Sequence, residues 1–156
     1  MTTTMQAAPV IVLDTNVCLD LFVFADPRCV GLLQALQAAE VAAVTDDACR
    51  EEWRRVLFYP VLRLDDAARA AAHARFDALV QRLPDAGDAD VSDPPPLRCR
   101  DPHDQKFLDL ALRTGAHWLL SRDDHLLSLA RRARRANLFA ILTPEAWLAA
   151  RAAASN

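Results

Sequence analysis

Residues 10–16 of this chain read Val-Ile-Val-Leu-Asp-Thr-Asn, a short apolar run that ends abruptly in a carboxylate. The run is rich in β-branched residues, which is typical of a strand buried on both faces of a parallel sheet. Asp14 therefore follows the carboxyl end of a predicted strand. Because open α/β sheets bind their ligands at that edge, Asp14 is a candidate functional residue. The alternative is that it only caps the helix that follows.

Three further acidic clusters lie just after or just inside predicted elements: Glu51-Glu52, Asp101 with Asp104, and Asp123-Asp124. This spacing permits one convergent acidic site. Mg²⁺ and Mn²⁺ take oxygen ligands, and several bare carboxylates repel one another unless a cation neutralises them. The sequence therefore predicts a divalent-metal site.

Each cluster leaves a choice of residue. Glu52 falls on or beside the buried stripe of its predicted helix, whereas Glu51 turns outward. We expect Asp104 to point at the same crevice as Asp14, with Asp101 capping or supporting it. Asp123 follows a strand directly, so it is preferred over Asp124 as the fourth site residue. For each of these acids the alternative is a helix cap or a solvated side chain.

Composition predicts a single domain. The 156 residues are 53% hydrophobic and 25% charged, with a net charge of −3. We expect a domain over residues 9–154 and a poorly ordered tail at 1–8. No apolar stretch approaches the roughly 18 residues of a membrane span, and no signal segment opens the chain, so we expect a cytoplasmic protein without a membrane partner. The four cysteines are widely spaced, which favours reduced thiols over a zinc site.

Strands and helices alternate along the chain, which predicts an α/β fold with a parallel sheet of four or five strands. Strands are predicted at 10–13, 41–44, 118–120 and 138–142, and helices at 16–24, 29–39, 47–58, 65–83, 105–113 and 144–154. A further helix begins at Asp123 or Asp124, and residues 84–96 form a predicted exposed loop. With only three glycines, a phosphate-binding glycine loop or a dinucleotide fingerprint is excluded.

Basic residues gather late in the chain. The run at 131–135 contributes Arg131, Arg132, Arg134 and Arg135 to one predicted helix. Such a run is either a solvated helix face or a patch that contacts a phosphate backbone. His103 and His125 flank the acidic clusters, where a histidine is more often solvent-facing than a metal ligand.

Four blocks of sequence, in this order, closely resemble the PIN-domain family. They are Leu-Asp-Thr-Asn at 13–16, Glu-Trp-Arg-Arg-Val-Leu at 52–57, Cys-Arg-Asp-Pro-His-Asp-Gln-Lys-Phe-Leu at 99–108, and Ser-Arg-Asp at 121–123. One such block is a weak signal, but four in the right order are specific. The resemblance spans about residues 9–150, and the nearest subgroup is that of toxin components of toxin–antitoxin systems.

The resemblance implies a three-layer α/β/α fold and a ribonuclease that depends on Mg²⁺ or Mn²⁺. Carried over by position, the catalytic and metal-binding acids are Asp14, Glu52, Asp104 and Asp123, with Asn16, Ser121 and Asp101 in support. Candidates to hold RNA at the rim are Arg122, Lys106 and the four arginines at 131–135. Ser121 stands where the family commonly has Thr, and His103 replaces a more usual acid. The implied partners are an RNA substrate and an antitoxin protein, and toxins of this kind often form homodimers.

Two other functions fit parts of the pattern. A small-molecule phosphatase of haloacid-dehalogenase type also places an Asp at a strand end, but that class usually has a second Asp two residues later, where this chain has Asn16. The other alternative is a non-catalytic domain that binds RNA or protein and whose acids only cap helices. The presence of an acid at all four motif positions argues against it.

Overall fold

This computed structural model describes residues 7–84 and 97–155. The predicted tail at 1–8 and the predicted loop at 84–96 lie outside these ranges, apart from residues 7, 8 and 84, so neither prediction is tested. Within the described ranges, no helix has both the length and the apolar character needed to cross a membrane.

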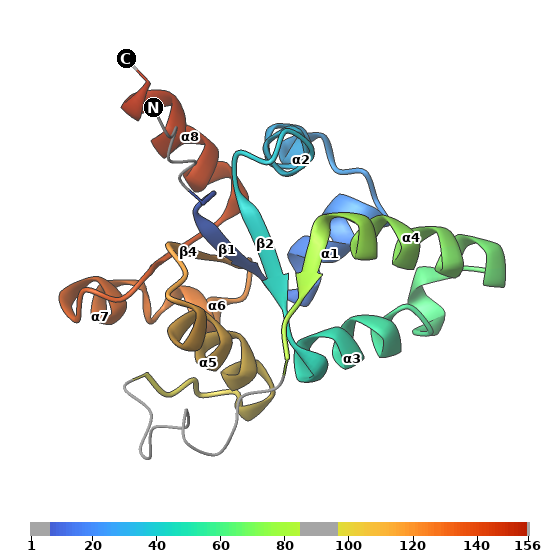
Figure 1. The fold of residues 1–156 in the computed structure, drawn as a ribbon. Coiled ribbons are helices and arrows are strands. Elements are labelled where there is room, and N and C mark those ends of the chain that lie inside the picture. The colour runs from blue at the N-terminus through green and yellow to red at the C-terminus, as the bar shows by residue number, and fades with distance from the viewer. Residues whose placement is uncertain (1–6, 85–96, 156) are drawn as a thin grey trace.

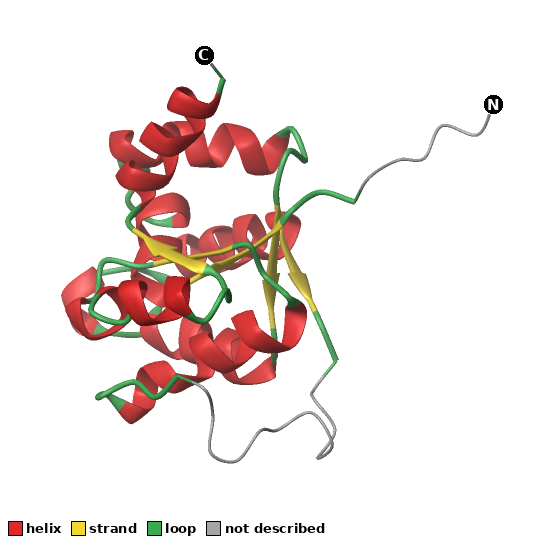
Figure 2. Ribbon diagram, turned by 90° about the vertical axis from the view of Figure 1, so that its left-hand side faces the viewer, coloured by secondary structure: helices red, strands yellow, loops and turns green. Residues whose placement is uncertain are grey.

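The centre of the fold is a five-stranded sheet in which every pairing is parallel, with the order β3-β2-β1-β4-β5. Figure 2 shows the strands running through the middle of the molecule with helices on both sides. The strands are β1 (Val10–Leu13), β2 (Ala42–Thr45), β3 (Val80–Arg82), β4 (Trp118–Leu120) and β5 (Ala140–Leu142). The predicted parallel α/β architecture is confirmed.

Helices cover both faces of the sheet and make three layers (Figure 1). One face carries α1 (Thr15–Phe22), α2 (Val30–Gln37), α4 (Asp66–Leu79) and α8 (Pro144–Ala154). The other face carries α5 (Gln105–Thr114), α6 (Asp124–Leu127) and α7 (Ala130–Arg135). Helix α3 (Asp47–Val56) follows β2 and contacts both α1 and α5. Short 3-10 turns lie at η1 (Pro27–Cys29), η2 (Pro60–Leu62) and η4 (Pro102–Asp104).

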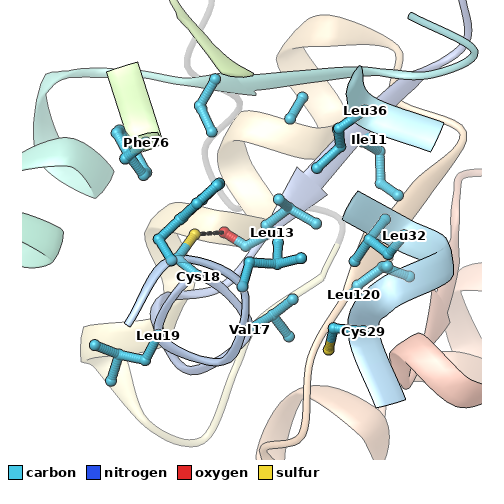
Figure 3. Packing of buried hydrophobic residues seen from close by; sticks show 14 of the residues in the cluster. Ile11, Leu13, Val17, Cys18, Leu19, Cys29, Leu32, Leu36, Phe76 and Leu120 are labelled. Atoms are coloured by element: carbon cyan, nitrogen blue, oxygen red, sulfur yellow. Dashed lines mark hydrogen bonds between the residues drawn. The ribbon is translucent and has the colours of Figure 1, made fainter. Parts of the chain in front are cut away.

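Alternation along β1 produces the two layers of core. Ile11 and Leu13 belong to the cluster under α1, α2 and α4, whereas Val12 belongs to the cluster under α5 and α7. Successive side chains of a strand point to opposite faces, so an uninterrupted apolar run is what a strand covered on both sides requires. Figure 3 shows the first cluster, in which the Cys18 thiol donates a weak hydrogen bond to the Leu13 carbonyl. All four cysteines are buried and free.

The predicted helix at 65–83 is too long. In the structure α4 ends at Leu79, and Val80–Arg82 form the edge strand β3, parallel to β2. An alanine-rich stretch favours a helix locally, but β-branched Val80 is buried where its backbone pairs with Ala43 of β2. The hydrogen bonds and burial offered by the sheet override local propensity at the end of this helix.

The helix predicted to begin at Asp123 or Asp124 is divided in two. Helix α6 ends at Leu127 and α7 begins at Ala130, with the Ser128 hydroxyl donating to the His125 carbonyl at 2.8 Å. A serine that bonds to the backbone in this way competes with helix continuation. The predicted ends of two other helices are confirmed: Gly115 closes α5 in the left-handed conformation, and Thr143 caps α8.

The topology creates a crevice between β1 and β4. From β1 the chain moves outward through β2 to β3, and then returns to place β4 and β5 on the other side of β1. The connection that follows β1 therefore runs toward one edge of the sheet, and the connection that follows β4 runs toward the other edge. In open α/β sheets this switch point is where ligands bind.

Truncation of an aromatic side chain in the core beneath α4 should cause a much larger loss of stability than truncation of an exposed one. Phe76 is 2% exposed, stacks on Trp53 at 4.9 Å and meets the edge of Phe22 at 5.9 Å. We expect Phe76→Ala to lower the free energy of unfolding by about 3–5 kcal/mol, because it leaves a cavity. The matched control is Phe24→Ala, at a side chain that is 55% exposed. Urea denaturation that gave equal losses for the two variants would contradict this packing.

Candidate metal centre

Asp14 is a buried carboxylate at the switch point. Its backbone N–H extends the β1–β4 ladder by donating to the Leu120 carbonyl at 3.1 Å. Its side chain caps α1 by accepting from the Val17 N–H at 2.9 Å, and it also accepts from the Ser121 hydroxyl at 2.5 Å. Asp14 is only 3% exposed. The Asp14 side chain therefore caps the helix and also lies at the predicted site. One carboxylate oxygen makes the cap, and the second lies beside the end of β4.

Ser121 and Asp123 follow β4 and complete this part of the site. Ser121 is fully buried, and its hydroxyl oxygen accepts from the Asp123 N–H at 2.9 Å while its hydrogen goes to Asp14. Asp123 caps α6 by accepting the His125 N–H at 2.8 Å. Asp124 is exposed. The chain therefore links the two acids of neighbouring strands through one serine.

Glu52 reaches the crevice from α3. Its two oxygens accept separately, one from the Thr15 hydroxyl and the other from Lys106 Nζ at 2.7 Å. Lys106 also donates to the His103 carbonyl at 2.6 Å. Glu51 is exposed, as predicted. The role of Thr15 was not predicted, although its position next to Asp14 is the signal that could have suggested it.

Asp101 and Asp104 flank the 3-10 turn η4. One oxygen of Asp101 caps this turn by accepting the His103 N–H at 3.0 Å. Among the hydrogen bonds within residues 7–84 and 97–155, the Asp104 carboxylate accepts none. Both side chains are half-buried. Asp104 is thus the acid with the most unused acceptor capacity.

These segments surround one cavity of about 500 Å³ at the carboxyl edge of the sheet. Its walls include every predicted acid, together with Asn16 and Asp101; Ser121 lies beneath Asp14 and does not line it. The lining residues are Asp14, Thr15, Asn16, Leu19, Glu52, Arg55, Val56, Tyr59, Val61, Leu62, Asp101, His103, Asp104, Phe107 and Asp123. Residues from four separate parts of the sequence therefore line one cavity, an arrangement that their spacing permits.

One close set of possible metal-ligand atoms in the described part of the chain includes a histidine. Asp101, Asp104 and His125 each offer one atom, and these atoms lie within 4.8 Å of one another. His125 Nδ1 is also 3.7 Å from Asp123 Oδ1. Sequence analysis favoured a solvent-facing His125, and its spacing relative to the other residues carried no metal-binding signal.

Burial and mutual repulsion make two of the acids reluctant to ionise. Burial is the main cause that raises the pKa of Asp14 from its usual 3.8 to about 6, and the negative charges of Asp104 and Asp123 add to it, while the Ser121 hydrogen bond opposes it. The pKa of Asp104 is likewise raised to about 6, by burial first and then by Asp123 and Asp101. Uncompensated negative charge is therefore concentrated in the cavity.

The donor set fits a hard divalent cation. Asp14, Asp104 and Asp123 come from three loops and present carboxylate oxygens to one cavity, and oxygen donors suit Mg²⁺ and Mn²⁺. Glu52 differs because a lysine and a threonine already satisfy its oxygens. A cation between the other acids would relieve the repulsion that raises their pKa values.

None of the predicted RNA-binding residues lines the cavity. Arg122 is half-buried and paired with Asp20 at 2.7 Å and with Glu145 at 2.5 Å, and Lys106 is paired with Glu52. The four arginines at 131–135 lie on the exposed side of α7 and do not line the cavity. Arg55, which was not singled out in the sequence, lines the cavity instead.

Residues 10–125 match the family model described as the PIN domain. This chain belongs to the PIN-domain family. Members of the family are generally nucleases, and the matched region contains all four predicted acids. The resemblance read from the four sequence blocks is therefore confirmed.

The comparison with solved structures supports the PIN fold. One similar structure is that of VapBC2 from Rickettsia felis bound to a DNA fragment from their promoter. The TM-score is 0.57 at 10% sequence identity, over 85% of this chain and 96% of the other. At that identity the likeness shows the fold alone. No curated protein matches this chain.

The raised pKa of Asp14 predicts a specific pH dependence of stability in the metal-free PIN domain. Because the folded state holds this proton more tightly than the unfolded chain, the stabilisation is full below about pH 4 and is lost as the pH rises through about 6. Asp14→Asn keeps the helix cap but cannot ionise. We therefore compare the free energy of unfolding of Asp14→Asn with that of the wild type. The variant should gain about 2 kcal/mol on the wild type when the pH rises from 4.5 to 7.5.

Urea denaturation in EDTA at the two pH values measures this difference. Asp124→Asn removes the same charge from an exposed position and serves as the control. A difference between Asp14→Asn and the wild type that did not change with pH would show that Asp14 ionises normally.

Proposed function

We propose that this PIN domain is a metal-dependent endoribonuclease that hydrolyses phosphodiester bonds of RNA. The observation that carries the proposal is the convergence of Asp14, Asp104 and Asp123 on one cavity at the β1–β4 switch point. Family membership supports nuclease chemistry, and the close group of Asp101, Asp104 and His125 supports a divalent ion. The choice of RNA over DNA rests on the resemblance to toxin-type PIN domains.

In this proposal Asp14, Asp104 and Asp123 hold Mg²⁺ or Mn²⁺ with carboxylate oxygens. Such an ion, when bound, lowers the pKa of a water ligand and stabilises negative charge on the phosphate. Ser121 fixes Asp14 and the Asp123 backbone in one geometry, so the two acids are positioned before substrate arrives. No side-chain nucleophile is required, because water attacks phosphorus and the ribose oxygen leaves.

Glu52 reaches the same cavity from α3. Thr15 and Lys106 hold its carboxylate in place, so its charge faces the cavity in a fixed position. The Lys106 ammonium is paired with Glu52 and Arg55 lines the cavity, and we propose that these two cations contact the phosphates on either side of the cleaved bond. Asn16 and Asp101 complete the polar wall.

The other basic residues have different roles. Arg122 ties the β4–α6 connection to α1 and α8 through Asp20 and Glu145, so its guanidinium is engaged within the protein. The four arginines of α7 could contact only a strand that extends beyond the cavity. Backbone contacts of that kind strengthen binding without reading sequence.

We further propose that the enzyme is the toxin of a toxin–antitoxin pair, works in the cytoplasm, and forms a homodimer. The similar fold of VapBC2 from Rickettsia felis supports the toxin role. An antitoxin protein is the corresponding proposed partner. Tyr59 and Val61 are exposed apolar side chains that line the cavity, where a protein partner could bury them.

Purified protein should cleave RNA only with a divalent ion. We expect Mn²⁺- or Mg²⁺-dependent cleavage that EDTA abolishes and that Asp14→Asn lowers by at least about a hundredfold, because a ligand is lost. Gel analysis of single-stranded and structured RNA, with single-stranded DNA and small phosphate esters in parallel, measures it. Cleavage of the esters alone would support a phosphatase. Binding of Mn²⁺ without any hydrolysis would support a non-catalytic domain.

Two neighbouring pairs of acids allow a matched test of which residues act. We expect Asp123→Asn and Glu52→Gln each to lower the cleavage rate by about tenfold or more, whereas Asp124→Asn and Glu51→Gln leave it nearly unchanged. The paired residues carry the same charge and differ in whether they line the cavity. Equal losses within a pair would mean that general negative charge matters, and not the position of the carboxylate.

A further inference from the structure

The imidazole of His125 does not line the cavity, but it lies close to two acids that do, Asp101 and Asp104. One of its nitrogens is within 4.8 Å of ligand atoms of both Asp101 and Asp104, although these residues come from a different loop. Its Nδ1 is 3.7 Å from Asp123 Oδ1. A nitrogen donor is thus surrounded by three carboxylates in a site otherwise built of oxygen.

The local fold fixes this position. The Asp123 carboxylate accepts the His125 backbone N–H at 2.8 Å, which sets the first turn of α6. The His125 carbonyl accepts from Ser128 at 2.8 Å, which holds the end of that turn. The backbone on both sides of the imidazole is therefore restrained. The side chain itself is 50% exposed, so an ion and its water ligands can reach it.

The acids around His125 have free acceptor capacity. Asp101 uses one oxygen for the His103 N–H, and in the described part of the chain its other oxygen has no hydrogen-bond donor. The Asp104 carboxylate has none at all within the same residues. By contrast, both oxygens of Glu52 are already bound. The most available ligand atoms therefore belong to the acids that lie close to His125.

We propose that His125 is a direct nitrogen ligand, with Asp101 and Asp104, of a divalent ion bound where these two acids border the cavity, and that it makes the site select Mn²⁺ over Mg²⁺. Mg²⁺ strongly prefers oxygen ligands, whereas Mn²⁺, as a first-row transition-metal ion, also accepts an imidazole nitrogen. The inference rests on the metal-dependent function proposed above, and it assigns Asp101 a ligand role in addition to its cap.

The chain contains a matched control. His103 lines the cavity and is exposed, but it is not part of the close group of ligand atoms to which His125 belongs. The two remaining histidines are elsewhere: His73 accepts from the Trp53 indole N–H at 3.2 Å, and His117 precedes β4 at the opposite edge of the sheet. A nitrogen signal from a bound ion can therefore be assigned by substitution of His125 and His103 alone.

Pulsed electron paramagnetic resonance of the full chain, without a histidine tag and loaded with Mn²⁺, tests the ligand directly. We expect a ¹⁴N coupling from bound imidazole in the wild type and in His103→Gln, and its loss in His125→Gln. No coupling in the Mn²⁺-loaded wild type, or a coupling that survived His125→Gln, would overturn the proposal. Failure of the wild type to bind Mn²⁺ would do the same.

Calorimetric titration with Mn²⁺ and Mg²⁺ tests the selectivity. We expect His125→Gln to weaken Mn²⁺ binding by about tenfold and to change Mg²⁺ binding much less. His125→Asp restores an oxygen ligand, so it should bind both ions yet show no ¹⁴N coupling. Equal weakening for the two ions in His125→Gln would overturn the selectivity.

These readouts separate this inference from the proposed ribonuclease. RNA cleavage by a protein whose bound Mn²⁺ has no nitrogen coupling would leave the ribonuclease standing and remove the histidine ligand. A coupling lost only in His125→Gln, without cleavage of any RNA, would support the ligand and count against the enzyme.

Discussion

The parallel register of β1 with β4 is the constraint on which the site depends. Leu13 pairs with Leu120, so the next residues along the two strands, Asp14 and Ser121, lie side by side and join at 2.5 Å. Ser121 in turn holds the Asp123 backbone. A slip of one residue would send these side chains to the opposite face, where apolar helices cover the sheet. The apolar run of β1, buried on both faces, makes such a slip costly, so the stability of the core also fixes the geometry of the acids.

The same constraint creates an electrostatic conflict. Asp14 is held where burial and neighbouring acids raise its pKa, and Asp104 is in a similar position. The fold compensates Glu52 with Thr15 and Lys106, but it leaves Asp104 without a donor among the described residues. The hydrogen bonds of Glu52 occupy both of its oxygens, whereas the oxygens of Asp104 remain available to bind a ligand. Functional sites commonly hold such locally unfavourable arrangements, which a rigid scaffold stabilises.

Local patterns predicted the parts of the fold whose signal is local. The strands at β1 and β4, the cap at Thr143 and the helix end at Gly115 each follow from a few neighbouring residues. Strand β3 was missed because Val80–Arg82 continue a helical pattern and become a strand only by pairing with β2. The break between α6 and α7 was missed for a related reason, since Ser128 is compatible with a helix until its hydroxyl binds the His125 carbonyl.

The sequence by itself determined the parallel α/β class, the family and the acids that would converge, because strand burial, turn residues and the order of motifs are written along the chain. The tertiary structure alone decided that Lys106 and Thr15 hold Glu52 and that Arg122 is engaged within the protein. It alone brought His125 to Asp101 and Asp104. The physical reason is that these contacts join loops from distant parts of the chain, whose approach depends on the sheet register and on the angle at which each helix leaves its strand.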